Sequence, residues 1–277
     1  MKLKKLLQHD FIIEFESLLA CDFEKTLFKA SLRNYCSHGN PLRFHNFAFS
    51  MRELVLRIID RRAPNSEVKN ANWYKRESTR YEVTRRQKLK FCAQRYLSDK
   101  YLNQDELDEL NQSIKDYLKE FNFFNKYTHI TPKHLNSCPH KFYDDMKFII
   151  KRSKEVIEQL STLEGQVASC VESKLQDEIF DKVVNNFPDD LSILANNVIL
   201  EQVYPEVIVI DEITENRMDL IVTGSLEVSQ EYGKGEDFLE MSNSYSFETS
   251  VDVSVSDPLD INVYPNDVEI DTSSWYE

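Results

Sequence analysis

The stretch LIVTGSLEVSQE, residues 220–231, alternates apolar and polar side chains, which is the pattern of a half-buried β-strand. A second alternating stretch spans residues 244–255, and Gly233-Lys234-Gly235 between the two is typical of a hairpin turn. The apolar run Val207-Ile208-Val209-Ile210 precedes both stretches. We therefore expect a small antiparallel sheet or sandwich in the C-terminal part of the chain.

The preceding 200 residues have the three-and-four spacing of amphipathic helices instead. Breaks at Gly39-Asn40-Pro41 and Pro64-Asn65-Ser66 separate the first helices. We expect helices over residues 10–35, 41–62, 84–96, 105–124 and 143–180, the last with an interruption near Gly165. The sequence thus predicts an α+β fold with an N-terminal all-α domain, a long connecting helix and a C-terminal antiparallel β domain. The expected boundaries are 1–140, 141–198 and 199–277.

Charge is distributed very unevenly along the 277 residues. Residues 1–100 carry 21 Lys and Arg against 11 Asp and Glu, a balance of +10, whereas residues 201–277 carry 2 against 19, a balance of −17. A basic domain is suited to contacts with phosphate groups. The acidic end would repel nucleic acid and is suited to a basic partner, or to the basic half of the chain itself.

Several classes of protein are excluded by what the sequence lacks. No run of ~18 apolar residues is present, so we expect no membrane span. No apolar segment follows the basic residues at the N-terminus, and the five scattered cysteines form no CxxC pair. We therefore expect a cytoplasmic protein with reduced thiols. The glycine-rich motifs of P-loop and Rossmann nucleotide-binding proteins and the GxSxG motif of hydrolases are also absent.

The first candidate catalytic group is RNYCSH, residues 33–38. Its spacing resembles the RNxxxH motif of HEPN-type ribonucleases, in which the histidine performs acid-base chemistry and the arginine stabilises charge on the phosphorane. This resemblance implies catalytic roles for Arg33 and His38 and an HEPN-like helical bundle. The structural alternative is a helix C-terminus at which basic side chains face the last carbonyls and Gly39 follows.

The second candidate is the stretch NPLRFHNFAFSMREL, residues 40–54. Arg43, Asn46 and Glu53 lie at helical spacing on one face, and Arg52 lies roughly 100° around the helix from Glu53. Such a face either binds phosphate groups or is simply the solvated side of an amphipathic helix.

The third candidate combines aromatic and basic residues. NWYKR, residues 72–76, is followed by a basic helix that contains Arg85 and Arg86. Aromatic rings can stack on bases while cations neutralise phosphates, so Trp73, Tyr74 and Lys75 are candidates for contact with nucleic acid. A solvated basic helix with one core tryptophan has the same composition.

The fourth candidate is KYTH, residues 126–129, which leads into His134, Cys138 and His140. Together with His129 these are four potential ligands, but their spacing matches no zinc motif, so we expect no metal or other cofactor. His129 is a candidate for acid-base chemistry, and a capping or core histidine is the structural alternative.

Together, NPLRFHNFAFSMREL, NWYK, KYTHI and the terminal DTSSWYE resemble the bacterial family of predicted pPIWI-associating nucleases, from about residue 38 to the C-terminus. Members of this family are found near prokaryotic PIWI-like and other phage-defence genes. The resemblance implies functional roles for the matching positions, which are Arg43, Asn46, Arg52, Glu53, Trp73, Tyr74, Lys75, Lys126 and His129.

Two functions are consistent with these patterns. The first is a defence-associated nuclease that acts on RNA rather than DNA without a metal, with acid-base work by His38 or His129. The second is a non-catalytic subunit that senses nucleic acid or an effector and docks a partner through its acidic β domain. Both imply other proteins of a defence operon as partners, and a homo-oligomer is a further expectation. The terminal Trp275 and Tyr276 either close a strand or contact a partner.

Overall fold

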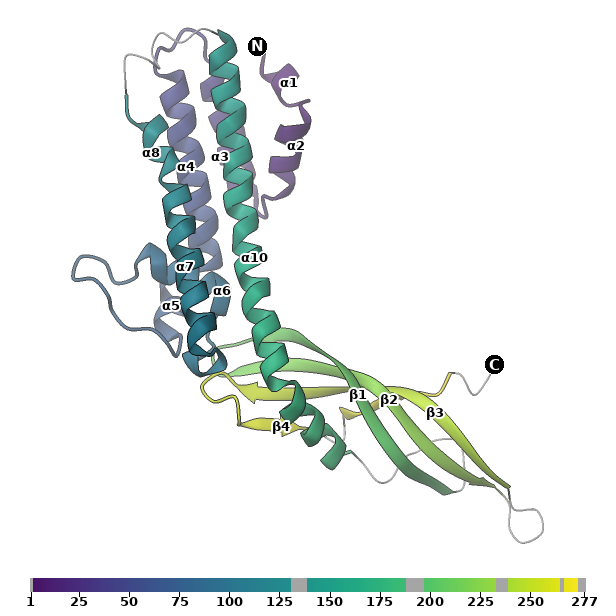
Figure 1. Cartoon of the computed structure of the whole chain (residues 1–277). Helices are drawn as coiled ribbons and strands as arrows, with labels where there is room; N and C mark the ends of the chain where they lie inside the picture. Colours follow the sequence, from purple (N-terminus) through teal and green to yellow (C-terminus); the bar gives the residue numbers. More distant parts are fainter. Residues whose placement is uncertain (1, 131–138, 188–196, 233–238, 265–266, 274–277) are drawn as a thin grey trace. The chain divides into compact units, whose positions relative to one another are not determined.

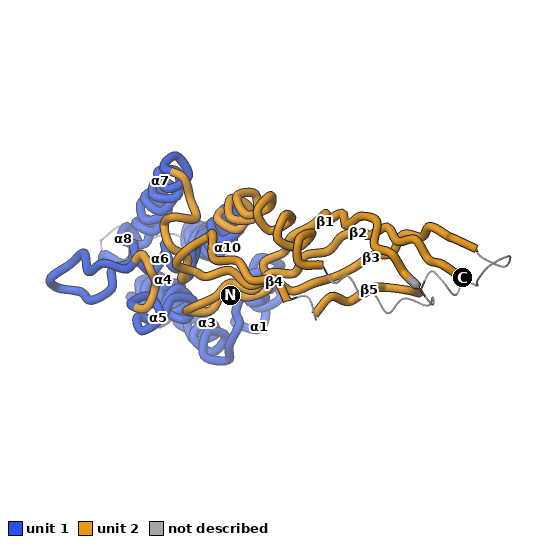
Figure 2. Tube along the Cα trace, turned by 90° about the horizontal axis from the view of Figure 1, so that it is seen from below, with its two compact units in different colours: residues 1–69, 74–95, 104–166 blue, residues 70–73, 96–103, 167–277 orange. Residues whose placement is uncertain are grey.

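The computed structural model describes residues 2–130, 139–187, 197–232, 239–264 and 267–273. These residues form two compact units (Figure 2). Unit 1 comprises residues 1–69, 74–95 and 104–166, and unit 2 comprises residues 70–73, 96–103 and 167–277. Unit 1 is helical and unit 2 contains an antiparallel sheet, so the predicted α+β class is confirmed.

Helices form in each of the five regions that the spacing predicted, and the structure adds the short helices α1, α5, η1 and α8 (Figure 1). Their bounds are α1 Leu3–Leu6, α2 Asp10–Ser17, α3 Asp22–Tyr35, α4 Arg43–Arg62, α5 Asn65–Asn70, α6 Arg85–Gln94, the 3-10 turn η1 Asp99–Tyr101, α7 Gln104–Phe121, α8 Phe123–Thr128 and α10 Pro139–Asn185. None of the helices within the described ranges is both long and apolar enough to cross a membrane.

One expected helix is divided in two. The segment predicted over residues 10–35 breaks between Ser17 and Asp22. The side chain of Glu24 explains the break, because its Oε2 accepts a hydrogen bond from the Ala20 backbone amide at 3.0 Å in the connecting turn. Its other oxygen accepts from Arg61 at 2.7 Å, which ties this turn to the end of α4. Glu24 is only 1% exposed, so its charge depends on these partners.

The helix α6 begins at a capping box. The Thr84 hydroxyl accepts a hydrogen bond from the backbone N–H of Gln87 at 3.2 Å. The side-chain oxygen of Gln87 accepts one from the backbone N–H of Thr84 at 2.9 Å. This reciprocal pair satisfies two backbone donors at the helix N-terminus and fixes where the basic helix starts.

The longest helix, α10, runs through Gly165 without a break. Residues before position 167 belong to unit 1, where Met146, Ile149, Ile150, Val156, Ile157 and Leu160 are buried. Residues from 167 onward belong to unit 2, where buried apolar residues recur every fourth position, at Val167, Val171, Leu175, Ile179 and Val183. The same helix therefore contributes to both cores.

The sheet of unit 2 consists of β1 Asn197–Ile213, β2 Arg217–Tyr232, β3 Leu239–Ser254, β4 Ile261–Val263 and β5 Glu269–Asp271. The strand order is β1-β2-β3-β4, with β5 also pairing with β3. β2 and β3 pair antiparallel from Arg217↔Ser254 to Tyr232↔Leu239, which confirms the predicted pairing. Even-numbered residues of β2 from 218 to 228 are buried, as the alternation predicted.

Packing on the buried face of the sheet comes from residues of unit 2 itself. The Phe187 ring, just beyond α10, packs edge-on against Phe247 of β3 with ring centroids 5.1 Å apart. The 3-10 turn adds a polar anchor, because the Tyr101 hydroxyl donates to the Ser254 carbonyl at 2.5 Å. Figure 1 shows the C-terminal part of α10 beside the strands.

The strand β1 pairs only with β2 among the described strands. Its register shifts at three places, between Leu200 and Gln202, between Pro205 and Val207, and between Ile210 and Glu212. Val207 and Val209 are about half exposed, at 51% and 50%. β1 is therefore an irregular edge strand with an apolar outer row.

Some sequence-based expectations concern residues outside the described ranges. These are the turn Gly233-Lys234-Gly235, the candidate metal ligands His134 and Cys138, and the terminal Trp275-Tyr276-Glu277.

The two glycines Gly165 and Gly224 provide a matched test of packing. A Cβ at Gly165 would meet nothing within 4 Å, so Gly165→Ala should stabilise α10 by about 0.5–1 kcal/mol. A Cβ at Gly224 would lie 2.8 Å from Pro205 Cα and 2.9 Å from the Phe247 ring, and closer still to the Tyr204 carbonyl oxygen. Gly224→Ala should therefore destabilise the sheet by about 1–3 kcal/mol. Denaturant unfolding followed by circular dichroism checks both, and equal effects of the two changes would contradict this packing.

Candidate functional site

A short loop between α3 and α4 positions the first group of predicted site residues. α3 ends at Tyr35, so Arg33 lies in its last turn and His38 lies beyond the helix. The Asn40 side chain accepts from the Leu42 amide at 2.9 Å, and the Arg43 amide donates to the Asn40 carbonyl at 3.1 Å. This tight turn places His38 opposite Arg43, the first residue of α4.

The side chains of His38 and Arg43 are in direct contact. Arg43 Nη1 lies 2.5 Å from His38 Nδ1. A guanidinium group can only donate hydrogen bonds, so Nδ1 accepts and the ring proton is on Nε2. The guanidinium carbon also lies 4.8 Å from the centroid of the Phe142 ring, at the start of α10. An exposed imidazole and a half-buried guanidinium are thus held together at one end of unit 1.

Tyr35, the last residue of α3, is buried near Arg43. Its ring packs edge-on against Phe47 of α4 with centroids 5.8 Å apart. Burial raises the pKa of the Tyr35 hydroxyl to about 12, although the nearby Arg43 charge acts in the opposite direction. The hydroxyl therefore stays protonated at neutral pH and adds no charge beside Arg43.

His45 anchors the segment that carries the other predicted catalytic histidine. His45 is buried on the first turns of α4, and its Nδ1 lies 3.1 Å from the Tyr127 carbonyl oxygen of α8. The Tyr127 ring packs on Phe44 with centroids 5.9 Å apart. Lys126 and His129 flank Tyr127 and are exposed, so they lie at the end of unit 1 where α4 begins.

His45 is a positioning residue that the sequence reasoning did not single out. The available signal was a histidine between Phe44 and Phe47 on the buried face of an amphipathic helix. A buried polar side chain at such a position needs a hydrogen-bond partner, and here the partner is a backbone carbonyl of another helix.

Two further predicted residues lie two to three turns along α4. Arg52 is half-buried, and its Nε has no hydrogen-bond partner in the described part of the chain. Glu53 is also half-buried, and Phe49 is 53% exposed on the same side of the helix. Asn46 lies one turn after Arg43, and its backbone carbonyl accepts from Ser50. This outer face of α4 combines an arginine, an amide and an exposed ring.

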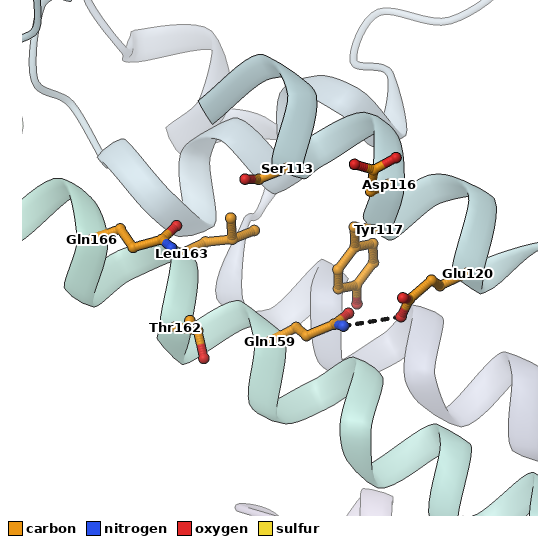
Figure 3. A pocket seen from close by; sticks show the side chains of 8 residues that line it. All are labelled: Ser113, Asp116, Tyr117, Glu120, Gln159, Thr162, Leu163 and Gln166. Atoms are coloured by element: carbon orange, nitrogen blue, oxygen red, sulfur yellow. Dashed lines mark hydrogen bonds between the residues drawn. The ribbon is translucent and has the colours of Figure 1, made fainter. Parts of the chain in front are cut away.

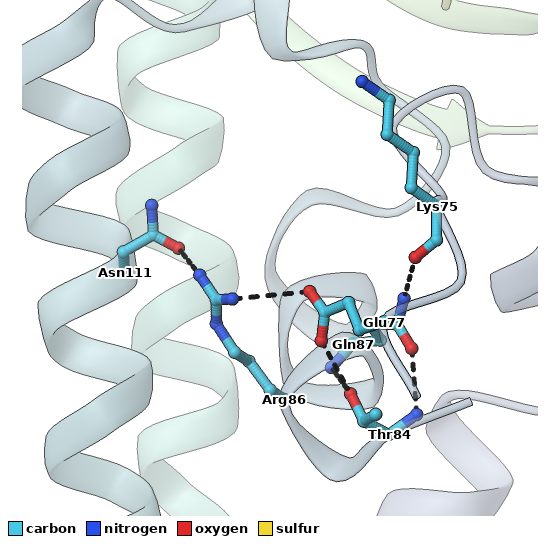
Figure 4. A network of polar contacts seen from close by, with 6 residues as sticks. All are labelled: Lys75, Glu77, Thr84, Arg86, Gln87 and Asn111. Carbon is cyan, nitrogen blue, oxygen red and sulfur yellow. Dashed lines mark hydrogen bonds and ion pairs between the residues drawn. The ribbon is translucent and has the colours of Figure 1, made fainter. Parts of the chain in front are cut away.

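Two of the remaining candidates, Lys75 and Arg86, belong to a polar network around α6 (Figure 4). Arg86 donates to Glu77 at 3.3 Å and to Asn111 of α7 at 2.8 Å, so it joins the preceding loop to α7. The Lys75 carbonyl accepts from Gln87 at 2.7 Å, while its ammonium group points away from the network. These contacts give Arg86 a structural role and leave the Lys75 charge accessible.

The other three candidates, Tyr74, Arg85 and Trp73, have different surroundings. The Tyr74 hydroxyl donates to the Glu82 carbonyl at 2.6 Å. The Arg85 guanidinium carbon lies 5.2 Å from the centroid of the Phe121 ring. Trp73 is half-buried and belongs to unit 2, whereas Tyr74 and Lys75 belong to unit 1.

The chemistry available at the end of unit 1 is proton transfer and stabilisation of negative charge. The described residues there include two exposed imidazoles, His38 and His129, and the cations Arg33, Arg43 and Lys126. Imidazoles transfer protons near neutral pH, and a preorganised guanidinium stabilises charge that develops on phosphate oxygens. Within the described ranges, no group of three or more His, Cys, Asp or Glu side chains is arranged to hold a metal ion.

Comparison with known proteins gives a consistent result over almost the whole chain. Two family models, both described as predicted pPIWI-associating nuclease, match residues 16–160 and residues 160–276. No curated protein and no solved structure shows a significant match. The chain belongs to the family of predicted pPIWI-associating nucleases.

Proposed function

We propose that this protein is a defence-associated nuclease that cleaves RNA without a metal ion, at the end of unit 1 formed by the α3–α4 loop and α8. The contact of 2.5 Å between Arg43 Nη1 and His38 Nδ1 is the observation that carries this proposal. It joins a proton-transfer group to a charge-stabilising group on an exposed surface. The family to which the chain belongs supports the nuclease class.

RNA carries the nucleophile for such a reaction in its own 2′-hydroxyl group. A general base removes the 2′-hydroxyl proton, the oxygen attacks the adjacent phosphorus, and a general acid protonates the leaving 5′ oxygen. The base must be a neutral imidazole and the acid an imidazolium, and His38 and His129 are the two imidazoles that we assign to these roles. Arg43 stabilises the charge on the phosphorane, with Arg33 as a second cation. DNA lacks the 2′-hydroxyl, which is why we propose RNA as the substrate.

The rest of the predicted set would hold the nucleic-acid chain. Lys126 lies beside His129, and Asn46, Arg52 and Glu53 extend the polar surface along α4. The accessible charges of Lys75 and Arg85 of unit 1, with Tyr74 and Arg86, would form a second basic surface for phosphate contact, and Trp73 of unit 2 is a further candidate for stacking on a base. The all-helical unit and the Arg33–His38 spacing are the features that this proposal shares with HEPN ribonucleases. Partners from a defence operon, a cytoplasmic location and a homo-oligomer belong to the same proposal.

The two histidines provide the first test. In buffer with a chelator, the wild-type protein should cleave a labelled single-stranded RNA and not the matching DNA. His38→Ala and His129→Ala should each lower the rate about 10²- to 10⁴-fold, because each removes a proton-transfer group. Lys182→Ala is the control, since it removes an exposed cation of unit 2 and leaves the proposed site of unit 1 unchanged. Full activity in both variants would overturn the assignment, as would cleavage that depends on an added divalent metal.

The Arg43 guanidinium is tested by a graded pair of variants. Arg43→Ala should lower the cleavage rate about 10²- to 10³-fold, because one preorganised donor to the phosphorane is lost. Arg43→Lys should recover part of that loss, since it keeps the charge but loses the fork of donors. Single-turnover rates at saturating RNA separate this effect from binding. If Arg43→Ala changed only RNA affinity, Arg43 would be a binding residue.

A second function, a non-catalytic subunit that docks a partner, is favoured by one observation in unit 2. The sheet has a depression of about 490 Å³ whose lining includes Glu206, Glu248, Glu269 and Asp271. Glu206 accepts from Ser225 at 2.9 Å. Among the described residues of 201–277, Arg217 is the sole Lys or Arg, and it pairs with Asp252 instead. Such a surface complements a basic polypeptide.

Amide substitutions on this surface test the docking function. The triple variant Glu248→Gln, Glu269→Gln, Asp271→Asn should no longer co-purify with a basic partner encoded beside it, and the wild-type complex should weaken as salt rises. The control neutralises three exposed acids of α10 in the same unit, Asp177→Asn, Glu178→Gln and Asp181→Asn. Equal binding by all three proteins would rule out docking at the depression.

A further inference from the structure

Unit 1 contains a pocket of about 220 Å³ between α7 and α10 that the proposed cleavage site does not use. Its lining consists of Ser113, Asp116, Tyr117, Glu120, Gln159, Thr162, Leu163 and Gln166. Figure 3 shows the Tyr117, Glu120 and Gln159 side chains pointing toward one another. All eight residues belong to unit 1.

The Tyr117 side chain is buried, yet its hydroxyl has no protein partner. Tyr117 is only 3% exposed, and its hydroxyl makes no hydrogen bond to any described residue. Burial raises the pKa of this hydroxyl far above its usual value, so it stays protonated and can donate. Buried polar groups in native proteins nearly always have a partner, so a hydroxyl directed into a pocket indicates a ligand there.

A second buried polar atom, Oε1 of Gln159, also lacks a hydrogen-bond partner among the described residues. Gln159 Nε2 donates to Glu120 Oε2 at 2.9 Å. A carboxylate can only accept, so this bond fixes the orientation of the amide and leaves Oε1 as the free acceptor. Gln159 Oε1 is buried and has no hydrogen-bond partner within the described ranges. The pocket thus offers a hydroxyl donor next to an amide acceptor.

The charges around the pocket restrict the ligand further. Its lining includes two carboxylates and no lysine or arginine. Each carboxylate is balanced from outside the lining, Glu120 by Arg152 at 3.1 Å and Asp116 by Lys119 at 2.8 Å. A phosphate or carboxylate ligand would find no cation in the pocket. A neutral ligand with an N–H donor for Gln159 and an acceptor for Tyr117 fits instead.

Size and shape agree with a small planar molecule. At roughly 30 Å³ of liquid volume per water molecule, the pocket has room for about seven waters, which is the scale of one heterocyclic base. Leu163 is 5% exposed in the unit and supplies an apolar surface for the face of a ring. The edges of nucleobases present adjacent donors and acceptors, and proteins read unstacked RNA bases through such edges.

We propose that the pocket formed by Tyr117, Gln159 and Leu163 binds a single nucleobase. This inference rests on the proposed function and deepens it, because an unstacked base of the RNA substrate would be held here. The sugar and phosphate would remain outside, near the exposed Lys115 and Lys119 of α7. The base belongs either to a free nucleoside or to a single-stranded chain.

The test compares the full-length wild-type protein with Tyr117→Phe by isothermal titration calorimetry. The ligands are the four ribonucleosides and a short single-stranded RNA. Loss of one neutral hydrogen bond should weaken binding about fivefold to tenfold. If the protein binds a nucleoside and Tyr117→Phe weakens that binding to this extent, a free base suffices as the ligand. If only the RNA binds, and Tyr117→Phe weakens that binding, the pocket holds a base within a chain.

Two further measurements separate loss of a ligand contact from loss of stability and test a different ligand. Tyr117→Phe removes no protein hydrogen bond, so its thermal midpoint should equal or exceed that of the wild type. The matched Tyr101→Phe removes the bond to the Ser254 carbonyl, so it should lower the midpoint and leave nucleoside affinity unchanged. Arginine amide is a third ligand, because a guanidinium could also fill an acceptor-rich pocket.

Three outcomes would overturn the proposal. These are the absence of binding by nucleosides and RNA, binding that Tyr117→Phe does not change, and Tyr117-sensitive binding of arginine amide without nucleoside binding. The last result would assign the pocket to a protein side chain. Because calorimetry with nucleosides needs no cleavage, a base site can stand even if the RNase activity fails, and the reverse also holds.

Discussion

The architecture depends on one long helix, α10, which buries apolar side chains in both units. α10 contributes Ile149, Ile150 and Leu160 to the core of unit 1 and then Val171 and Ile179 to the core of unit 2. Burial of each such side chain stabilises the fold by about 1.5–3 kcal/mol. Unit 1, which carries the candidate catalytic surface, and unit 2, which carries the sheet, therefore both rely on buried side chains of α10.

Local patterns predicted most of the fold, and departures from them have identifiable causes. Alternation predicted β2 and β3, because each has one buried face. The break before Asp22 could not be predicted from periodicity, since it depends on the long-range contact of Glu24 with Arg61. The suspected interruption at Gly165 does not occur, because a glycine costs only about 1 kcal/mol in a helix and the surrounding packing outweighs this.

The sequence predicted the family, which the two family models confirm, but not the geometry of the candidate site. The contact of His38 with Arg43 depends on the turn around Asn40, and a motif spacing carries no information about that turn. Composition grouped Arg86 with the nucleic-acid candidates, although its bonds to Glu77 and Asn111 give it structural partners. Spacing could not reveal the pocket at Tyr117, because half of its lining lies on α7 and the other half on α10.

The irregular strand β1 also bears on how the molecule behaves in concentrated solution. An exposed edge with half-exposed Val207 and Val209 would otherwise offer a template for strands of other molecules, and so for aggregation. Pro205 cannot donate to such a ladder, and three register shifts interrupt its repeat. Acidic side chains at Glu201, Glu206, Asp211 and Glu212 add like-charge repulsion between copies. The strand is thus able to complete the sheet of its own chain while resisting extension into fibres.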